Sequence, residues 1–212
     1  MKISKKLLLL SALLTLGLGA RAQVGIKTNL LGWATTTTNI GVEVGAGRRT
    51  TLQAMAYLNP WDFGTDRHFR VWTVQPEYRH WFCSKFNGHF IGVHALGGEF
   101  NAKNINFPLQ ALTWGKAHDI NDAFPAKDHE GAWPDIEGEN SGRHVEGWQV
   151  GVGFSYGYQW LLSKHWNLEA SVGVGYVYSP MKYFGRCQQV IDRRHLHYVG
   201  PTNAQISFIY VF

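Results

Sequence analysis

Cysteine, long apolar runs and net charge are all scarce in this sequence. Only Cys83 and Cys187 occur, so at most one disulfide can form within the chain. No apolar run after residue 22 approaches the roughly 20 residues that a membrane-spanning helix needs. These absences exclude a protein that crosses a bilayer with helices after its first residues, but not one that crosses it with strands.

The first 22 residues have the composition of an export signal. Lys2, Lys5 and Lys6 precede the apolar stretch 7–18, and 20–22 is a small-x-small cleavage site. The apolar stretch is too short to remain as a spanning helix. We therefore expect a cleaved signal peptide at 1–22, a mature domain at 23–212 and, given the strand pattern below, an outer-membrane location.

Little charge remains once this segment is removed. The chain has 20 basic and 15 acidic residues, and four of the basic residues lie in the signal, so 16 face 15. The mature chain thus carries a net charge of +1 and has no basic, aromatic-laced patch. This balance argues against a nucleic-acid partner.

Strict alternation of residue type along two segments is the strongest structural signal. In 148–162 the even positions are large and apolar or aromatic, most odd positions are small or polar, and 166–178 repeats this pattern. Trp148 to Trp160 and Trp166 to Tyr178 each span twelve residues, roughly 28 Å for strands tilted about 45°. This length suits the ~25 Å apolar band of membrane barrels, so these four aromatic residues are expected to form membrane girdles.

Six further segments complete a prediction of eight strands: 24–33, 38–46, 50–58, 69–82, 88–101 and 202–212. Tight turns follow the second, fourth and sixth strands. The connections that alternate with them are a short one near 34–37 and longer ones near 59–68, 102–144 and 179–201. Short periplasmic turns and longer external loops are typical of outer-membrane barrels. The sequence therefore predicts an all-β, eight-stranded antiparallel up-and-down transmembrane β-barrel.

The sequence also predicts the orientation or local geometry of several individual strand residues. Leu30 is expected to face outward from the first strand, and Pro76, which lacks a ladder donor, predicts a bulge. The facing of 88–101 stays open, because apolar residues occur there at both parities. Phe212 closes an outward-facing row in the last strand, and an aromatic C-terminus is what the barrel-assembly machinery is expected to recognise.

The opposite parity places polar residues inside the barrel, where eight strands leave room only for side chains. Two cations and three carboxylates among them can pair and block the lumen, which predicts no large pore. The expected network consists of Lys27, Glu43, Gln75, Glu77, Arg79 and Glu169, with Asn29, Gln53, Gln149, Asn167 and Gln205 also inside. The same topology puts Cys83 and Cys187 at opposite ends, beyond the ~7 Å that a disulfide allows, so both are expected to stay unpaired within the chain.

Five segments give the chain a family resemblance: 27–31, 74–82, 86–90, 151–160 and 166–170. Over about 27–212 the chain resembles the family called domain of unknown function 3575, DUF3575, of Bacteroidota. The resemblance implies an outer-membrane barrel, in some cases encoded beside fimbrial or surface-structure genes. It implies no catalytic residues.

Two expected external loops differ in charge. Residues 102–142 hold seven acids and three lysines, whereas 180–201 hold four cations and one acid. The acidic spacing matches no EF-hand, so a solvated loop is favoured over a Ca²⁺ site. The basic segment is expected to clamp the acidic loop or to touch lipopolysaccharide phosphates. Both 102–144 and 179–201 are candidate surfaces for a protein partner, beside the outer-membrane lipid itself.

Other motifs favour plain structural interpretations. His195 and His197 fall on one side of an extended segment, but a zinc site needs more ligands. Gly151-x-Gly153 lies inside a strand and lacks the geometry of a phosphate-binding loop. We expect no metal and no cofactor.

Function is predicted to be non-enzymatic, either structural in the cell envelope or adhesive at the surface. The alternative is a lipid-modifying outer-membrane enzyme, which would need a Ser, His or acid set near one leaflet. His80 and His94 lie deep in strands, and neither has an obvious serine partner.

Overall fold

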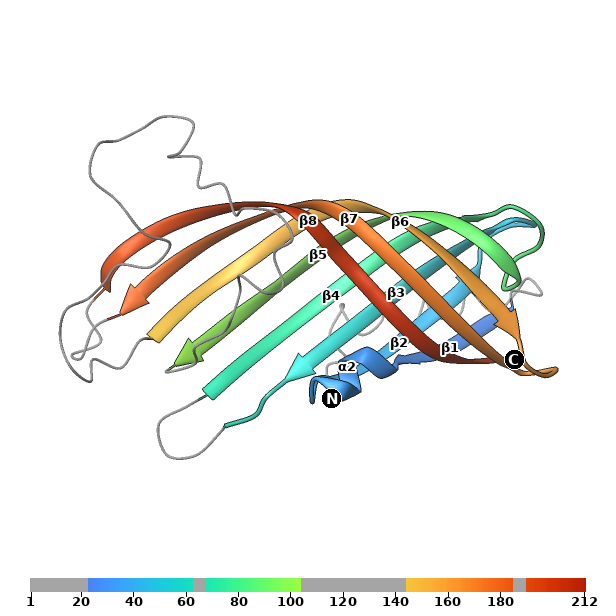
Figure 1. Ribbon diagram of the computed structural model, residues 1–212, viewed down its shortest axis with the longest axis horizontal. Helices are drawn as coiled ribbons and strands as arrows, with labels where there is room; N and C mark the ends of the chain where they lie inside the picture. Colours follow the sequence, from blue (N-terminus) through green and yellow to red (C-terminus); the bar gives the residue numbers. More distant parts are fainter. Residues whose placement is uncertain (1–22, 63–67, 104–143, 185–189) are drawn as a thin grey trace, which may run out of the picture.

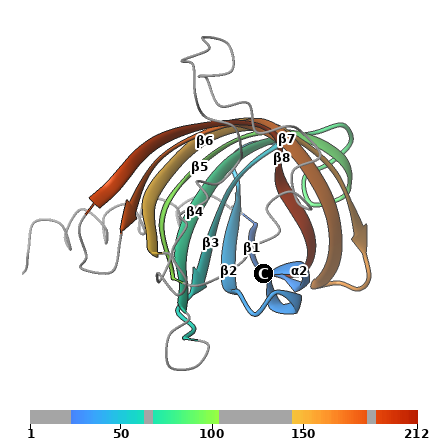
Figure 2. The ribbon, with the colours of Figure 1, turned by 60° about the vertical axis from the view of Figure 1, so that its left-hand side comes forward.

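The computed structural model describes residues 23–62, 68–103, 144–184 and 190–212, which form one closed barrel. Eight antiparallel strands follow each other in chain order and β8 pairs with β1 to close the ring (Figures 1 and 2). This confirms the predicted fold class. The strands are β1 Val24–Asn29, β2 Thr38–Gly45, β3 Thr50–Asn59, β4 His68–Trp81, β5 Gly88–Lys103, β6 His144–Leu161, β7 Trp166–Phe184 and β8 Val190–Val211, and the helix is α2 Leu30–Ala34.

The short turns 46–49, 82–87 and 162–165 gather at one end of the barrel, where the chain also ends (Figure 1). There Phe212 N donates to Val24 O at 2.9 Å. Gly88 begins β5 with φ +83°, a left-handed conformation that suits glycine at a tight turn. No helix in the described part of the chain is long and apolar enough to span a membrane.

The strands are staggered around the ring. Following paired residues from Glu77 through β3, β2 and β1 leads to Val211, whereas the route through β5, β6 and β7 leads to Gly200. Such a shear requires strands that tilt against the barrel axis. It also makes the rim uneven, because β8 pairs with β1 only from Ser207 to Val211 and continues to Val190 paired with β7.

The expected strand 24–33 is wrong beyond Asn29, because the chain turns there into α2. Asn29 caps the helix, and its side-chain oxygen accepts from Leu31 N at 3.1 Å. The same side chain bonds β8, donating to Ala204 O at 3.1 Å and accepting from Ile206 N at 3.2 Å. Leu30 therefore starts a helix that fills the seam above β1 and is not an outward strand residue.

The expected loop 179–201 is wrong over most of its length. Strand β7 continues to Phe184, β8 starts at Val190, and Lys182 pairs with Arg193 in their ladder. Likewise β5 extends to Lys103 and β6 begins at His144, so that the long connection shrinks to 104–143. Above the apolar wall the outward positions need not be apolar, so the alternation that marks strands disappears there.

Pro76 does not form a bulge. It pairs with Ala54, and the β4–β5 register is the same before it, at Val74 and Gly97, as after it. Register shifts occur instead where β7 meets β8, between Gly173 and Val174 and between Tyr183 and Phe184. In β5, Phe90 and Leu96 face the interior, while Ile91 and Val93 face outward, which settles the open parity of that strand.

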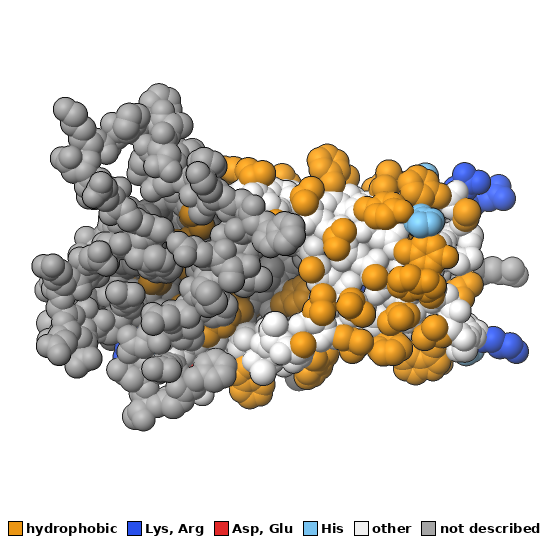
Figure 3. All heavy atoms as spheres, viewed as in Figure 1, with side chains coloured by type: hydrophobic (Ala, Val, Ile, Leu, Met, Phe, Trp, Pro, Cys, Tyr) orange, Lys and Arg blue, Asp and Glu red, His pale blue; other side chains and the backbone are white. Residues whose placement is uncertain are grey.

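Apolar side chains are spread over the barrel wall on the face that Figure 3 shows. Val152, Phe154, Val172 and Val174 are 58–69% exposed along β6 and β7. The interior is mainly polar, with Trp81, Phe86 and Phe90 as its largest buried apolar residues. The barrel is thus apolar outside and polar inside, the reverse of a soluble domain.

Candidate functional site

A buried ion-pair network fills the middle of the barrel. The Arg79 guanidinium makes a bidentate contact with the Glu169 carboxylate, donating to its two oxygens at 2.8 and 3.0 Å. It also lies 3.2 Å from Glu43 and 3.1 Å from Glu77. Lys27 Nζ is 2.9 Å from Glu169 and 3.5 Å from Glu43. All five side chains are fully buried, so every charge depends on these contacts.

Strand register brings these residues together. Glu43, Gln53 and Glu77 are successive partners across β2, β3 and β4 and project inward in one row. Gly41 leaves room beside them, since a Cβ there would lie 2.0 Å from Met55 Sδ and 2.8 Å from Lys27 Cγ. Inward glycines therefore make space for the long charged side chains.

Neutral donors complete the network. Thr51 Oγ1 donates to Glu43 at 2.6 Å, and Gln53 Nε2 donates to Glu77 at 3.3 Å. Ser155 Oγ from β6 also donates to Glu77. Three carboxylates face two cations, and these hydrogen bonds satisfy the oxygens that the cations leave.

The predicted network residues do not all join. Lys27, Glu43, Glu77, Arg79 and Glu169 contact one another as described above. Gln75 is buried inside the barrel, but its side-chain nitrogen has no hydrogen bond among the described residues. The partners Thr51 and Ser155 were not predicted, although their inward parity is readable from the alternation.

An aromatic plug closes the barrel at the short-turn end. The rings of Trp81 and Phe90 lie 4.8 Å apart, and Phe86 packs 6.2 Å from Trp81. Trp81 Nε1 donates to Thr51 Oγ1 at 2.9 Å. The Arg79 guanidinium lies 4.3 Å over the Phe90 ring, which joins the plug to the network.

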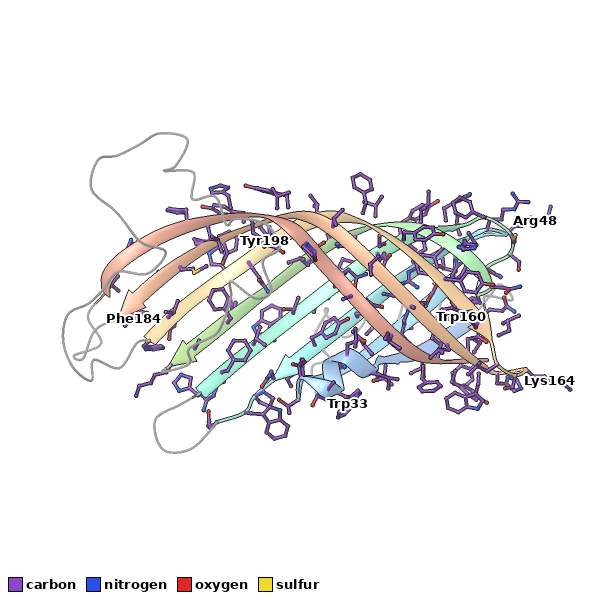
Figure 4. The ribbon with its side chains drawn as sticks, viewed as in Figure 1. Trp33, Arg48, Trp160, Lys164, Phe184 and Tyr198 are labelled. Atoms are coloured by element: carbon purple, nitrogen blue, oxygen red, sulfur yellow. The ribbon has the colours of Figure 1, made fainter. Side chains whose placement is uncertain are left out.

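Aromatic residues form two groups at different heights on the outer wall. Trp160 lies toward the short-turn end, where Arg48 and Lys164 also lie (Figure 4), and Trp166 begins β7 directly after the turn 162–165. The Trp166 ring is 5.1 Å from Tyr210, whose ring lies 4.9 Å from Phe212. The exposed Phe212 thus stands in the lower aromatic group.

The upper group lies nearer the other end of the strands. Trp148 is 49% exposed, Tyr178 is partly exposed, and their rings are 5.8 Å apart. Trp72 of β4 and Trp148 of β6 flank the same residue of β5, because Glu99 pairs with both. Of the four predicted girdle residues, Trp160 and Trp166 therefore lie toward the short-turn end, and Trp148 and Tyr178 lie nearer the other end of β6 and β7.

The histidines fall into separate environments. His195 and His197 on β8 each bind a tyrosine of β7, Tyr178 at 2.7 Å and Tyr176, and no cluster of three metal-binding side chains occurs among the described residues. His94 lies inside the barrel, 2.8 Å from Thr202 Oγ1. Its Nδ1 has no partner in the described part of the chain, so this hydroxyl–imidazole pair lacks the acid that orients a catalytic histidine.

Some predicted features lie outside the described residues: the signal peptide 1–22, the acidic connection 104–143 and Cys187. Cys83 is exposed and free. Arg193, which the sequence predicts in a loop, is an exposed residue of β8 near the end of the β7–β8 hairpin that lies away from the short turns.

Fold and site together define the class of protein: a closed eight-stranded antiparallel barrel with an apolar outer wall and an interior that holds buried ion pairs and aromatic rings. A family model described as protein of unknown function (DUF3575) matches residues 6–212. The chain belongs to this family. No curated protein and no solved structure matches it significantly.

Proposed function

We propose that the protein is a non-enzymatic outer-membrane β-barrel whose blocked interior makes it an anchor for its external connections. Export through a cleaved signal and insertion by the barrel-assembly machinery, with Phe212 as the assembly signal, belong to this proposal. The connection 104–143 and the upper end of the β7–β8 hairpin would then serve envelope structure or capture of a surface partner.

The observation that carries the proposal is the reversed polarity of the barrel. Monomeric soluble proteins rarely expose apolar patches larger than a few hundred Å². Here apolar side chains cover the outer wall between the two aromatic groups, while Lys27, Arg79 and three carboxylates are buried inside. A bilayer satisfies this arrangement, because it solvates the wall and meets aromatic residues at its two interfaces.

The blocked interior supports anchoring over transport. The network and the plug occupy successive levels of the lumen, and an eight-stranded barrel has room for little besides side chains. Fractionation of the native organism tests the location, with the protein expected in the outer-membrane fraction. Planar-bilayer recordings test the lumen, and stable conductance on the scale of a porin would contradict the proposal.

The partner surface is the finer part of the proposal. Deleting residues 105–140 is expected to spare barrel folding and to abolish partner capture in cells that are crosslinked before lysis. If the deletion variant captures partners as well as wild type does, the result would favour a structural role in the envelope. The link to fimbrial or other surface-structure assembly, which comes from the family resemblance, is tested by identifying the crosslinked partners.

A lipid-modifying enzyme is the alternative function. Its strongest support is the hydroxyl–imidazole pair of Thr202 and His94, which lies inside the barrel. Mass spectra of lipid A from a deletion strain decide between the two. Loss of a modified lipid species, restored by wild type but not by His94→Gln, would favour the enzyme.

A further inference from the structure

The outer wall has a groove over β4 and β5, on the opposite side of the barrel from β8. Its volume is about 580 Å³, and the small residues Pro76, Ala95 and Gly97 belong to its lining. Trp72 and Trp148 stand beside it. The groove lies on the face that the proposed function assigns to lipid, and the inference below rests on that assignment.

No packing requirement explains glycine at the floor of this groove. A Cβ added to Gly97 would meet only Gln149 O, at 4.0 Å. By contrast, a Cβ at the inward-facing Gly151 would lie 2.7 Å from Tyr176 O. Gly97 therefore leaves space on the outside of the barrel, whereas Gly151 is needed for close packing inside it.

A carboxylate lies at the upper end of the groove, between two tryptophans. Glu99 on β5 pairs with Trp72 on one side and Trp148 on the other, and all three side chains are exposed. Trp72 Nε1 donates to Glu99 Oε2 at 3.2 Å. Within the described residues this is the one hydrogen bond of the Glu99 side chain, and no cation pairs with it.

This chemistry selects an ammonium group. Indole faces attract cations, and a carboxylate between two indoles adds charge complementarity. A lone carboxylate supplies too few oxygens for Ca²⁺, which takes six to eight ligands. The groove below the carboxylate is apolar and opens toward the bilayer interior, where an acyl chain is the available ligand.

We propose that this groove binds one membrane lipid with a primary ammonium headgroup, such as an ethanolamine lipid, its ammonium at Glu99 and an acyl chain over Gly97. The Glu99 carboxylate holds the headgroup at the level of the upper aromatic residues. The lipid would thereby sit in one fixed place on the barrel wall.

Native mass spectrometry of the full chain, released from nanodiscs of equal phosphatidylethanolamine and phosphatidylglycerol with identical acyl chains, tests the site. Wild type is expected to retain phosphatidylethanolamine about tenfold over phosphatidylglycerol, since an ion pair and a cation–π contact act together. Glu99→Gln should bring this ratio close to one. Gly97→Leu should reduce retention of both lipids by filling the groove.

Two variants serve as matched controls. Glu146→Gln removes a carboxylate that binds Asn101 and has no flanking tryptophan pair, and Ala204→Leu enlarges an exposed small residue on β8. Both should retain lipid as wild type does. An unchanged lipid ratio in Glu99→Gln, or unchanged retention in Gly97→Leu, would overturn the site. A wild-type dimer that Gly97→Leu abolishes would replace the lipid with a second copy of the chain.

Failure of the inference is distinguishable from failure of the proposed function. If the wild-type chain does not insert into vesicles at all, the outer-membrane proposal fails. If every variant inserts equally and none changes the bound lipid, the barrel remains a membrane protein and the lipid site is refuted.

Discussion

Arg79 is the residue on which the buried charges depend most, because its guanidinium reaches Glu43, Glu77 and Glu169. Arg79→Met would leave three buried carboxylates with Lys27 as their remaining cation. Removing one member of such a buried set costs about 3–5 kcal/mol. The free energy of unfolding, measured by urea titration in vesicles, is expected to fall by this amount.

The matched comparison is Arg70→Met, because Arg70 pairs with Asp62 at 2.8 Å in an exposed position. Exposed pairs contribute little, so this variant should unfold as wild type does. The double variant Arg79→Met with Glu169→Gln should regain part of the loss, since it also removes one stranded carboxylate. Equal stability of all these variants would mean that the network does not hold the barrel together.

For single residues, the sequence predicts which side of the barrel wall a side chain faces better than it predicts which residues that side chain contacts. Parity alone places Lys27, Arg79 and the three glutamates inside, as observed. It does not predict hydrogen bonds, which depend on how far each side chain reaches around the ring. Gln75 faces inward like its neighbour Glu77, yet it is paired in register with Met55 and finds no partner for its amide nitrogen among the described residues.

Among the elements, α2 has the largest effect on barrel closure, because it covers the seam where β8 continues beyond β1. Asn29 connects the three elements: it caps α2 and exchanges two hydrogen bonds with β8. Asn29→Ala removes the cap and both bonds, which should lower the free energy of unfolding by about 2 kcal/mol. The urea midpoint in vesicles measures this loss.

Asn29→Asp separates these contributions. The aspartate keeps the oxygen that accepts from Leu31 and Ile206 but cannot donate to Ala204, so its stability should lie between wild type and Asn29→Ala. Thr35→Ala, at the other end of the helix, is the control for the helix alone. An Asn29→Ala variant as stable as wild type would show that α2 does not secure the seam.

Strand ends were the least predictable elements, for a physical reason. Alternation is enforced where one face meets an apolar medium and the other meets the packed interior. Above Trp148 and Tyr178 this contrast fades. Pro180 and Pro201 also imitate turn signals, although both belong to the β7–β8 ladder, Pro201 at its register shift. Conversely, the sequence predicts residues 30–33 as strand, although they belong to α2, because Leu30 continues the outward apolar positions of β1.

Two features fill the interior of the barrel, the ion-pair network and the aromatic plug, and only the first can be predicted from the sequence pattern. The ion pairs could be predicted, since charged residues at inward positions must find partners. The aromatic plug could not, because Phe86 is a turn residue with φ 62°, which strand parity does not cover, and the sequence leaves the facing of Phe90 open. Because these two features lie inside the barrel, the outer wall is the surface whose chemistry determines the medium that surrounds the barrel.

A charge placed on that wall tests its environment directly. Val172 on β7 lies midway between Trp166 and Tyr178 and is 65% exposed. In a bilayer an arginine near the midplane of a barrel wall costs about 2–4 kcal/mol, falling to about 0–1 near the interfaces. Val172→Arg should therefore lower the free energy of unfolding in vesicles by that larger amount. Val190→Arg, at the far end of β8, should have little effect. In water both substitutions on exposed sites would be nearly neutral, so equal and small changes would place the wall outside the membrane.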